Sequence, residues 1–439
     1  MSKGHLKCVI VAIFIAIFSI LTSPMEAYAQ GKATLSDGNT AWLITATALV
    51  LFMTIPGLAL FYGGLVRARN VLSVLMHCYA ICCISSILWF VGVYSLAFGN
   101  GGGLNQWIGD LSKMFMSGVG TNSLSGDIPE SVFFMFQMTF AIITPALIVG
   151  AYVERIKFSA VCLFSALWLV LVYAPVCHWV WGGGWLADMG VMDFAGGIVV
   201  HVTAGISALV IAIVLGNRSK FPDQISPPHA PWMVMVGAAM LWIGWFGFNA
   251  GSALSAGSDA GMAMLVTHLS AATASLVWLT IEWIRFGKPS LIGLVTGTIA
   301  GLATVTPASG FIGPIGGLIC GLVGGGVCYY CVDLIKVRFN IDDSLDVFAV
   351  HGVGGATGTL LIAFLALESM SGVGLEEGVS SISQLKTQII GIGSVLVWSI
   401  AVTLAIIYIT RRLVGLRVES EDELEGLDYK AHGETGYNL

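Results

Sequence analysis

The chain has 439 residues, of which 56% are hydrophobic and only 10% are charged, and its formal net charge is −6. A soluble domain usually carries about 25% charged residues, so this chain has too few to cover a water-soluble globule of its size. The composition therefore excludes an ordinary soluble protein and predicts an all-α membrane protein with many spans. We expect no enzymatic activity and no nucleic-acid partner.

Residues 1–29 have the pattern of a cleavable signal peptide. Lys3 and Lys7 supply a positive start, 9–21 is an apolar run, and Ala-Tyr-Ala at 27–29 is a small-x-small cleavage motif. An uncleaved first helix is the alternative. Because the apolar run is short for a span and a cleavage motif follows at the right distance, we expect removal of this segment.

Eleven hydrophobic runs of about 18–25 residues follow, each long enough to cross a bilayer. They lie at 40–62, 71–98, 128–151, 158–180, 194–215, 231–251, 260–284, 290–306, 312–333, 347–368 and 387–410. These runs define a membrane domain over residues 30–410, and residues 411–439 form a tail behind it.

The lysines and arginines between the runs indicate the orientation of the chain. One set of alternate connections holds nearly all of them: Arg67, Arg69, Arg155, Lys157, Arg218, Lys220, Arg285, Lys288, Lys336 and Arg338, then Arg411, Arg412 and Arg417 after the last run. The other set holds only Lys32, Lys113 and Lys386. By the positive-inside rule, we expect a multi-pass protein of the cell (plasma or inner) membrane, with the mature N-terminus outside and the C-terminus in the cytoplasm.

The fifth and tenth runs share a pattern of histidine followed by glycine. His201 stands just before Ala204-Gly205, and His351 just before Gly354-Gly355. Eleven runs with opposite ends suggest two units of five and one extra helix. Because five is odd, the two units would insert in opposite orientations, and inverted repeats place substrate sites at their interface near the membrane midplane.

His201 and His351 carry ionisable rings in otherwise apolar sequence, which is costly in a membrane and usually functional. No charged partner is near either in sequence, so we expect two neutral imidazoles, which can hydrogen-bond each other and line a narrow pore. A purely structural bond between two helices is one alternative. Axial ligation of haem is another, although haem-binding spans commonly repeat histidines along one helix.

Aromatic residues form a second candidate group. Phe136 and Phe140 are four residues apart and share a helix face, and Phe248 and Ser252 have the same spacing. An aromatic stripe is often core or lipid contact. Near the predicted outer ends, however, Trp181 could bind a small cation through its ring, and the hydroxyl of Ser252 could accept a hydrogen bond from it.

Asp193 opens the run that carries His201, where an aspartate commonly caps the helix. Its fixed charge could also stabilise an approaching cation, and we expect capping together with orientation of the nearby binding site. Cys328 and Cys331 have no second pair at zinc spacing, so we expect buried thiols, no metal site and no cofactor.

Five motifs in order along the chain resemble the ammonium transporter (Amt/Mep/Rh) superfamily, on its Amt side. They are ERIKFSA at 154–160, WGGG at 181–184, DFAGG at 193–197 with His201, WFGFNAGS at 245–252, and His351-Gly352. The resemblance covers essentially the whole mature length.

This resemblance implies eleven helices in two inverted five-helix repeats plus one extra helix, and a homotrimer with one pore in each subunit. It implies ammonium or ammonia as substrate, with methylammonium as a candidate analogue. It also implies roles: an outer recruitment site at Trp181, Ser252 and Phe140, a gate of Phe140 and Phe248 with Phe136 beside it, a twin-histidine pore of His201 and His351, and an acid near the entrance, Asp193.

On composition alone, residues 411–439, with an acidic run at 419–425, form a solvated tail. In the family such tails pack on the cytoplasmic face and take part in regulation by PII signalling proteins, so the resemblance implies a PII partner. The chain has Gly436 where an alanine is usual in the family.

A bare cation is opposed by several kcal/mol in a hydrophobic pore. The expected mechanism is therefore recruitment of ammonium at the outer site, loss of its water and then of a proton near the gate, and passage of ammonia along the histidines. Potassium has a similar size but no proton to give up. The alternatives are a sensor that binds ammonium without appreciable flux and a neutral-gas channel of the Rh type.

Overall fold

The computed structural model describes residues 34–437, and the predicted signal peptide lies outside them. The described residues are helical apart from turns, connections and one short hairpin. Its strands, β1 (Leu124–Ser125) and β2 (Ile128–Pro129), pair antiparallel with Leu124 opposite Pro129. The prediction of an all-α membrane protein is confirmed at this level.

Ten helical stretches within residues 34–437 are long and apolar enough to cross a membrane. They are Asp37–Leu65, Ala68–Phe98, Glu130–Tyr152, Phe158–Asp188, Gly197–Leu215, Pro231–Gly251, Ser258–Phe286, Pro314–Arg338, Phe348–Leu365 and Ser381–Val414. The run predicted at 290–306 forms a shorter apolar helix, α13 (Leu291–Val305), of 15 residues. It rises about 23 Å, which is less than the thickness of a bilayer core.

Four of these stretches are continuous α-helices, and a fifth is an α-helix that ends in a π-helical turn. They are α6 (Glu130–Tyr152), α11 (Pro231–Gly251), α12 (Ser258–Phe286), α14 (Pro314–Asp333, followed by the turn Leu334–Arg338) and α16 (Ser381–Val414).

Three stretches contain a π-helical turn in their middle. The turn Met53–Leu58 divides α2 (Asp37–Phe52) from α3 (Ala59–Leu65). The turn Trp89–Val93 divides α4 (Val71–Leu88) from α5 (Tyr94–Phe98). The turn Leu169–Tyr173 divides α7 (Phe158–Trp168) from α8 (Ala174–Trp181), and α9 (Trp185–Asp188) follows α8. In the first of them, Pro56 has no backbone N–H to donate, and Ile55 before it leaves the helical conformation at φ −128° and ψ 106°.

Two further π-helical turns begin a span instead of dividing one. Gly197–Val202 leads into α10 (Thr203–Leu215), and Phe348–Gly352 leads into α15 (Val353–Leu365). The remaining short 3₁₀ turns lie in connections at Ala68–Asn70, Gly102–Leu104, Met114–Met116 and Glu368–Met370.

The span boundaries follow the sequence closely where a strong signal marks the end. The run predicted at 231–251 matches α11, which begins at Pro231 because proline suits the first turn of a helix. The run predicted at 387–410 is too short, since α16 continues to Ser381 and Val414. Its first turns carry buried Gln384 and Gln388, whose side-chain amides donate to the carbonyl oxygens of Gly190 and Met192. Because these residues are polar, an apolar run in the sequence ends before them.

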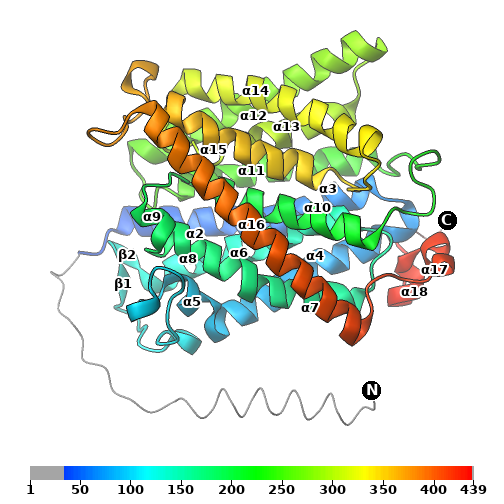
Figure 1. The fold of residues 1–439 in the computed structure, drawn as a ribbon, viewed down its shortest axis with the longest axis horizontal. Helices are drawn as coiled ribbons and strands as arrows, with labels where there is room; N and C mark the ends of the chain where they lie inside the picture. Colours follow the sequence, from blue (N-terminus) through cyan, green and yellow to red (C-terminus); the bar gives the residue numbers. More distant parts are fainter. Residues whose placement is uncertain (1–33, 438–439) are drawn as a thin grey trace. The chain divides into compact units, whose positions relative to one another are not determined.

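Helix α16 lies across the outside of the bundle, where it packs on α7, α10 and α15 (Figure 1). Its two faces differ in character. The inner face buries Ser399 and Thr403, and Thr403 shares a hydrogen bond of 3.0 Å with Ser207 of α10. The outer face exposes Val397 and Tyr408, as expected of a helix that meets lipid.

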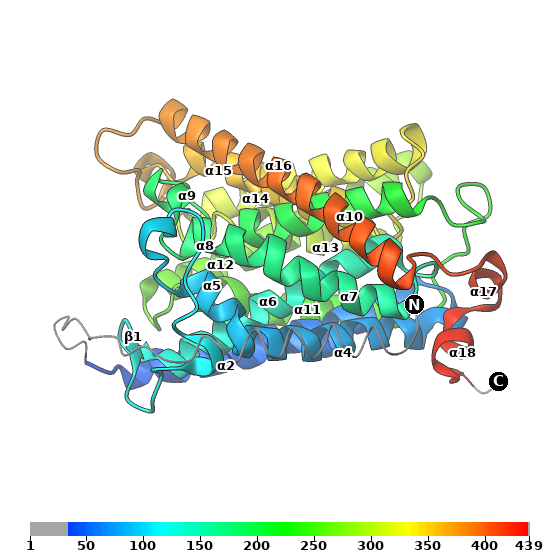
Figure 2. The ribbon, with the colours of Figure 1, turned by 60° about the horizontal axis from the view of Figure 1, so that its bottom comes forward.

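The two ends of the bundle differ. The helices α17 (Ser420–Glu425) and α18 (Leu427–His432) lie at one end, here called the tail end, and β1, β2 and α9 lie at the other, here called the hairpin end (Figures 1 and 2). Asn39 connects the parts of the hairpin end: its side chain donates to Asp127 at 2.6 Å and accepts from the N–H of Ala256 at 2.8 Å.

The prediction of a solvated tail from composition is wrong for Glu423 and Asp428, which are 1% and 2% exposed. The carboxylate of Glu423 accepts hydrogen bonds from Ser219 and Arg417. The carboxylate of Asp428 accepts from the N–H of Ser73, at the start of α4. The tail therefore packs on the connections of the tail end.

Candidate functional site

Two buried imidazoles face each other inside the bundle. The Nδ1 atoms of His201 and His351 are 3.3 Å apart. The two residues are only 1% and 4% exposed. A bond between two Nδ1 atoms needs one donor and one acceptor, so two neutral rings share a single N–H between them. The Nε2 atom of His201 is buried without a hydrogen-bond partner among the described residues, which leaves it free to donate to or accept from a small solute.

Asp193 fixes the segment that carries His201. Its carboxylate accepts hydrogen bonds from four successive backbone N–H groups, at 2.8, 2.6, 2.8 and 3.1 Å, those of residues 196–199. These groups belong to the open end of the π-helical turn and have no partner inside it. The capping predicted for Asp193 is therefore present, and it determines where His201 stands eight residues later.

Asp343 has the same relation to His351, although it was not predicted as a site residue from the sequence. It also lies eight residues before the histidine, and it accepts the N–H of Phe348 at 2.7 Å. Its other oxygen is buried without a partner among the described residues. Burial and the nearby charge of Asp346 raise the pKa of Asp343 to about 7. Comparison of the eight-residue spacings in the two halves would have found it.

Glycines allow the two histidine segments to approach each other. Gly205 and Gly355 each lie four residues after a histidine. A Cβ atom on Gly205 would lie 2.3 Å from the backbone of Gly352, and one on Gly355 would lie 2.6 Å from the Cβ of His201. Any larger residue would force the segments apart and would break the bond between the two rings.

A column of aromatic rings leads from the hairpin end to His201. The ring of Trp181 meets that of Phe140 edge to face, with centroids 5.8 Å apart, and Phe140 lies against Phe248 at 4.3 Å. Phe136 packs beside Phe140 at 5.1 Å. Phe248 in turn stacks on His201 at 6.1 Å. All the aromatic residues singled out from the sequence thus lie in one connected group.

Trp245 joins this group on the inner side. Its ring stacks on His201 with centroids 5.6 Å apart, and its indole N–H donates to Thr306 at 2.8 Å. Asn249 does not join it: the side chain turns to α12 and donates to Thr267 at 2.9 Å. Trp245 and Asn249 are four residues apart, so helical spacing alone would put them on one face and could not separate them.

The polar groups at the hairpin end are held by the backbone. The indole N–H of Trp181 donates to the carbonyl oxygen of Asp193 at 2.8 Å, which orients the ring. The hydroxyl of Ser252 donates to the carbonyl oxygen of Phe248 at 2.8 Å. Since its only proton is used there, the Ser252 oxygen has lone pairs left to accept a hydrogen bond and nothing to donate. It is suited to a ligand that carries N–H groups.

Two cavities meet at His351. An apolar cavity of about 10 Å³, room for about one water molecule, borders both histidines, Phe248 and Trp245. A larger cavity of about 220 Å³ begins at His351 and reaches the tail end, where Arg218 lies in its wall. The histidines therefore stand between the aromatic column and a roomy chamber at the tail end.

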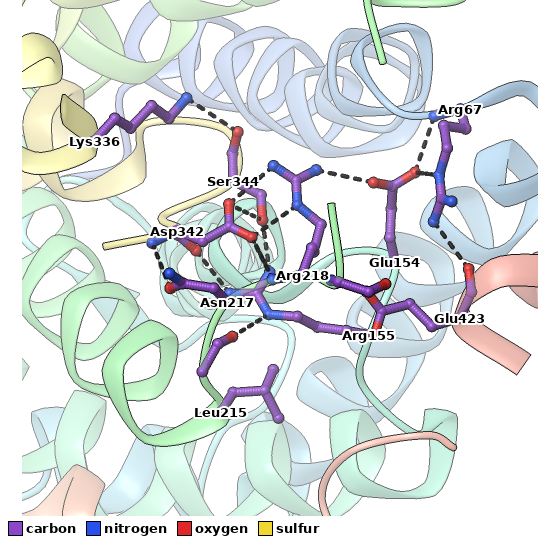
Figure 3. Close-up of polar contacts among 12 residues, drawn as sticks. Arg67, Glu154, Arg155, Leu215, Asn217, Arg218, Lys336, Asp342, Ser344 and Glu423 are labelled. Atoms are coloured by element: carbon purple, nitrogen blue, oxygen red, sulfur yellow. Dashed lines mark hydrogen bonds and ion pairs between the residues drawn. The ribbon is translucent and has the colours of Figure 1, made fainter. Parts of the chain in front are cut away.

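Charged groups at the tail end form a network (Figure 3), and Arg67, Glu154 and Arg218 among them line the chamber. The guanidinium of Arg218 bonds to Glu154 at 2.8 Å and to both oxygens of Asp342 at 2.8 and 2.9 Å. Arg67 bonds to the other oxygen of Glu154 at 2.7 Å. Arg155 is completely buried and donates to the carbonyl oxygen of Asp342 at 2.7 Å. Connections far apart in the sequence are thereby tied together at the tail end.

This network should make the protein sensitive to acid. Burial raises the pKa of Glu154, but Arg218 and Arg67 outweigh it and hold the pKa at about 2, against an ordinary 4.5. A depressed pKa means that the carboxylate contributes stability above pH 4.5 that is lost as the pH falls toward 2, by about 3 kcal/mol if fully expressed. Thermal unfolding in detergent should show a steep loss of stability between about pH 4.5 and pH 2.

Glu154→Gln should remove much of that acid-dependent loss and lower stability at neutral pH. The exposed Glu421 of α17 offers a matched control, because Glu421→Gln should leave the pH profile unchanged. The same pH profile in wild type and Glu154→Gln would contradict the assignment of this sensitivity to the network.

Two other buried histidines, His77 and His178, have structural partners. His178 is fully buried, and its ring nitrogens bond to the carbonyl oxygens of Ala97 and Asn105 at 2.9 and 2.6 Å. His77 stacks on Phe158 with centroids 6.0 Å apart. Neither lies in the walls of the two cavities that meet at His351.

These observations define a class of protein: a helical multi-pass membrane protein with a histidine pair beside a cavity in its core. Residues 41–437 match the Ammonium Transporter Family. The ammonium transporter of Aquifex aeolicus is 44% identical over 432 residues, which cover 98% of this chain and 99% of that protein. The chain belongs to the Ammonium Transporter Family, which confirms the resemblance inferred from the five motifs.

Solved structures agree with this assignment. Mep2 of Saccharomyces cerevisiae superposes with a TM-score of 0.80 at 34% identity, over 88% of this chain and 89% of that one. A sensor Amt protein superposes with a TM-score of 0.84 at 30% identity, over 90% and 98%. Because the named relatives are transporters, the expectation that this chain is not an enzyme is also confirmed.

Proposed function

We propose that this protein carries ammonium across the cell membrane by separating it from one proton. Ammonium binds at Trp181 and Ser252, loses its hydration shell against Phe140, and transfers a proton to a water molecule near the gate, before the histidines. Ammonia then passes His201 and His351 into the chamber at the tail end. Methylammonium follows the same route as a substrate analogue.

The observation that carries this proposal is the bond between His201 and His351 beside a cavity with room for about one water molecule. The free Nε2 of His201 can accept a hydrogen bond when its Nδ1 carries the proton, and can donate one when it does not. The pair therefore offers a partner to ammonia in either tautomer while it holds no net charge. A small neutral solute with both donors and a lone pair suits such a site.

Selectivity follows from the same chemistry. The cavity wall is apolar apart from the two histidines and Trp245, so a desolvated ion would be opposed there by several kcal/mol. Ammonium escapes that cost because it can leave a proton behind. Potassium cannot, and it offers no N–H group to the oxygen of Ser252.

The outer site is suited to a cation with N–H groups. The ring of Trp181 can interact with a cation through its face, and Ser252 can only accept a hydrogen bond. Phe140 lies between Trp181 and Phe248 in the aromatic column and is the third member of the recruitment site. With Phe248, and with Phe136 beside them, Phe140 also forms the gate.

We further propose that the chain has eleven spans, the ten long stretches and the shorter α13, in two inverted units of five with α16 as the extra helix. The paired spacings from Asp193 to His201 and from Asp343 to His351 support two related halves, each with a π-helical turn at the histidine. The lysine and arginine bias then puts the tail end in the cytoplasm and the mature N-terminus outside.

We also propose a homotrimer with one pore in each subunit, and a PII signalling protein as partner of residues 411–439. The docking of Glu423 and Asp428 on the tail end supports a tail that takes part in regulation, because Glu423 lies in the wall of the chamber below His351. A pull-down of a PII protein by the full chain but not by a chain ending at residue 414 tests the partner.

Trp181→Leu should raise the KM for methylammonium about 2- to 30-fold, because it removes a cation–π contact of about 0.5–2 kcal/mol. The effect should be largest at low substrate concentration. Uptake of labelled methylammonium into proteoliposomes measures it, and Trp181→Phe should give an intermediate value. Trp232 is 63% exposed on α11, so Trp232→Leu serves as the matched control. Wild-type uptake by Trp181→Leu at micromolar substrate would count against the recruitment site.

A sensor is the second candidate function, and the similarity to a sensor Amt protein favours its consideration. A sensor would bind ammonium without appreciable flux. Uptake into proteoliposomes separates the two functions directly, because a sensor leaves the interior free of substrate.

A further inference from the structure

A third cavity, here called the hollow, lies at the hairpin end beside the outer site. Its volume is about 210 Å³, and Trp181 forms part of its wall. Three further aromatic rings, one acid and one base line it together with Leu124, Ser125 and Gly182: Tyr94, Phe98, Phe133, Glu130 and Lys113. None of these five residues has a place in the transport path described above.

The side-chain ammonium group of Lys113 lies in this hollow. The Nζ atom of Lys113 forms an ion pair with the carboxylate of Glu130 and lies 5.8 Å from the centre of the Tyr94 ring. The hydroxyl of Tyr94 donates to the same carboxylate at 2.9 Å. A carboxylate together with an aromatic face is the combination that binds a primary ammonium ion.

The two charged side chains differ in their exposure to solvent. The side chain of Glu130 is 9% exposed, and that of Lys113 is 34% exposed. Glu130 stands in the first turn of α6, where the helix dipole favours a negative charge. The carboxylate is therefore a fixed part of the fold and would persist without its lysine.

We propose that this hollow is a binding site for small primary ammonium ions that Lys113 keeps filled, and that Lys113 thereby sets the affinity of the adjacent outer site. With Lys113 in place, Glu130 is neutralised and cations move on to Trp181. Without it, one uncompensated negative charge faces the approach to Trp181 and holds ammonium there. This inference depends on the proposed function, since it concerns the affinity of the same entrance.

The charges of Glu130 and Lys113 are close enough to Trp181 to affect a cation that binds there, since all three residues line the same hollow. Charges in the wall of one hollow act over distances comparable with the Debye length, about 8 Å at physiological ionic strength. Because the charge of Glu130 is partly buried, it is screened less than a surface charge. The change in affinity should therefore be clear at low salt and small at high salt.

The test is the KM for labelled methylammonium in proteoliposomes at low ionic strength. Lys113→Gln should lower the KM about fivefold, and Glu130→Gln, which leaves Lys113 without its partner, should raise it about fivefold. The double variant Lys113→Gln/Glu130→Gln should return to the wild-type value. Lys386, exposed near the start of α16 at the end that we assign to the same side of the membrane, gives the matched control, because Lys386→Gln should change nothing.

The expected shifts should shrink toward zero in about 0.5 M salt, where the Debye length is only a few ångströms. Unchanged KM in either single variant at low salt would overturn the inference, as would a double variant that behaves like Lys113→Gln. Wild-type proteoliposomes without any uptake would instead contradict the proposed function, so the two failures are distinguishable.

Discussion

Replacing His201 and His351 together with leucine is expected to abolish ammonium-selective flux or to convert it into unselective cation leakage. The reason is that the two rings bond to each other in the wall of the apolar cavity, and His351 also borders the chamber, at the point where the passing solute is neutral. Leucines in their place could neither hydrogen-bond ammonia nor take part in a proton's movement. Uptake of methylammonium and of potassium into proteoliposomes measures both outcomes.

A third histidine provides the control for this experiment. His268 is exposed on α12 and contacts the ring of Trp242, so His268→Leu should leave selective uptake close to wild type. Selective ammonium flux in a double His201/His351 variant that is folded and inserted would refute the role of the pair.

Asp193→Ala is expected to have an effect of similar size for a different reason. Four backbone N–H groups would lose their acceptor inside the protein, and each buried donor left unpaired costs about 1–3 kcal/mol. The π-helical turn that carries His201 would relax, and the twin-histidine bond would not survive a shift of about 1 Å. We expect uptake to fall more than 100-fold and the thermal unfolding temperature to drop.

Asp193→Asn separates the two contributions of this residue. The amide keeps one oxygen acceptor but has no charge, so its effect should lie between those of wild type and alanine. Asp188 offers a matched control nearby, because it is exposed and accepts one hydrogen bond, from Gln106 at 2.7 Å. Uptake by Asp193→Ala equal to that by Asp188→Ala would show that the four bonds do not hold the pore in place.

Much of the helical framework could be predicted because a membrane imposes one simple rule. Apolar runs of sufficient length become helices, since no other element satisfies its backbone in lipid. The run at 231–251 shows this at its clearest, with a proline at its start and Ser252 just beyond its end. At 387–410 the rule fails at the ends, because Gln384 and Gln388 are polar and nevertheless buried.

The candidate site was predictable where a residue is unusual in its surroundings. His201, His351 and Asp193 are polar groups beside or within apolar sequence, so each is conspicuous on its own. Asp343 is one of several acids in a polar connection, and only its spacing to His351 marks it. Trp245 is one of 13 tryptophans, and helix geometry alone could not tell that its ring stacks on His201.

Contacts between distant segments could not be predicted from composition. The tail looks solvated because most of its residues are polar, yet Glu423 is buried by its bonds to Ser219 and Arg417. Lys113 and Glu130 face each other across the loop that contains the hairpin, and nothing in the spacing of 17 residues indicates an ion pair. Such pairs depend on how connections fold over the helix ends.

The most direct test of the central claim is a combined measurement of current and uptake in proteoliposomes that contain the wild-type protein, with ammonium and potassium compared at equal concentration. A pore in which ammonium must give up a proton predicts uptake with ammonium and none with potassium. Equal fluxes of the two ions, or no uptake of ammonium, would contradict it.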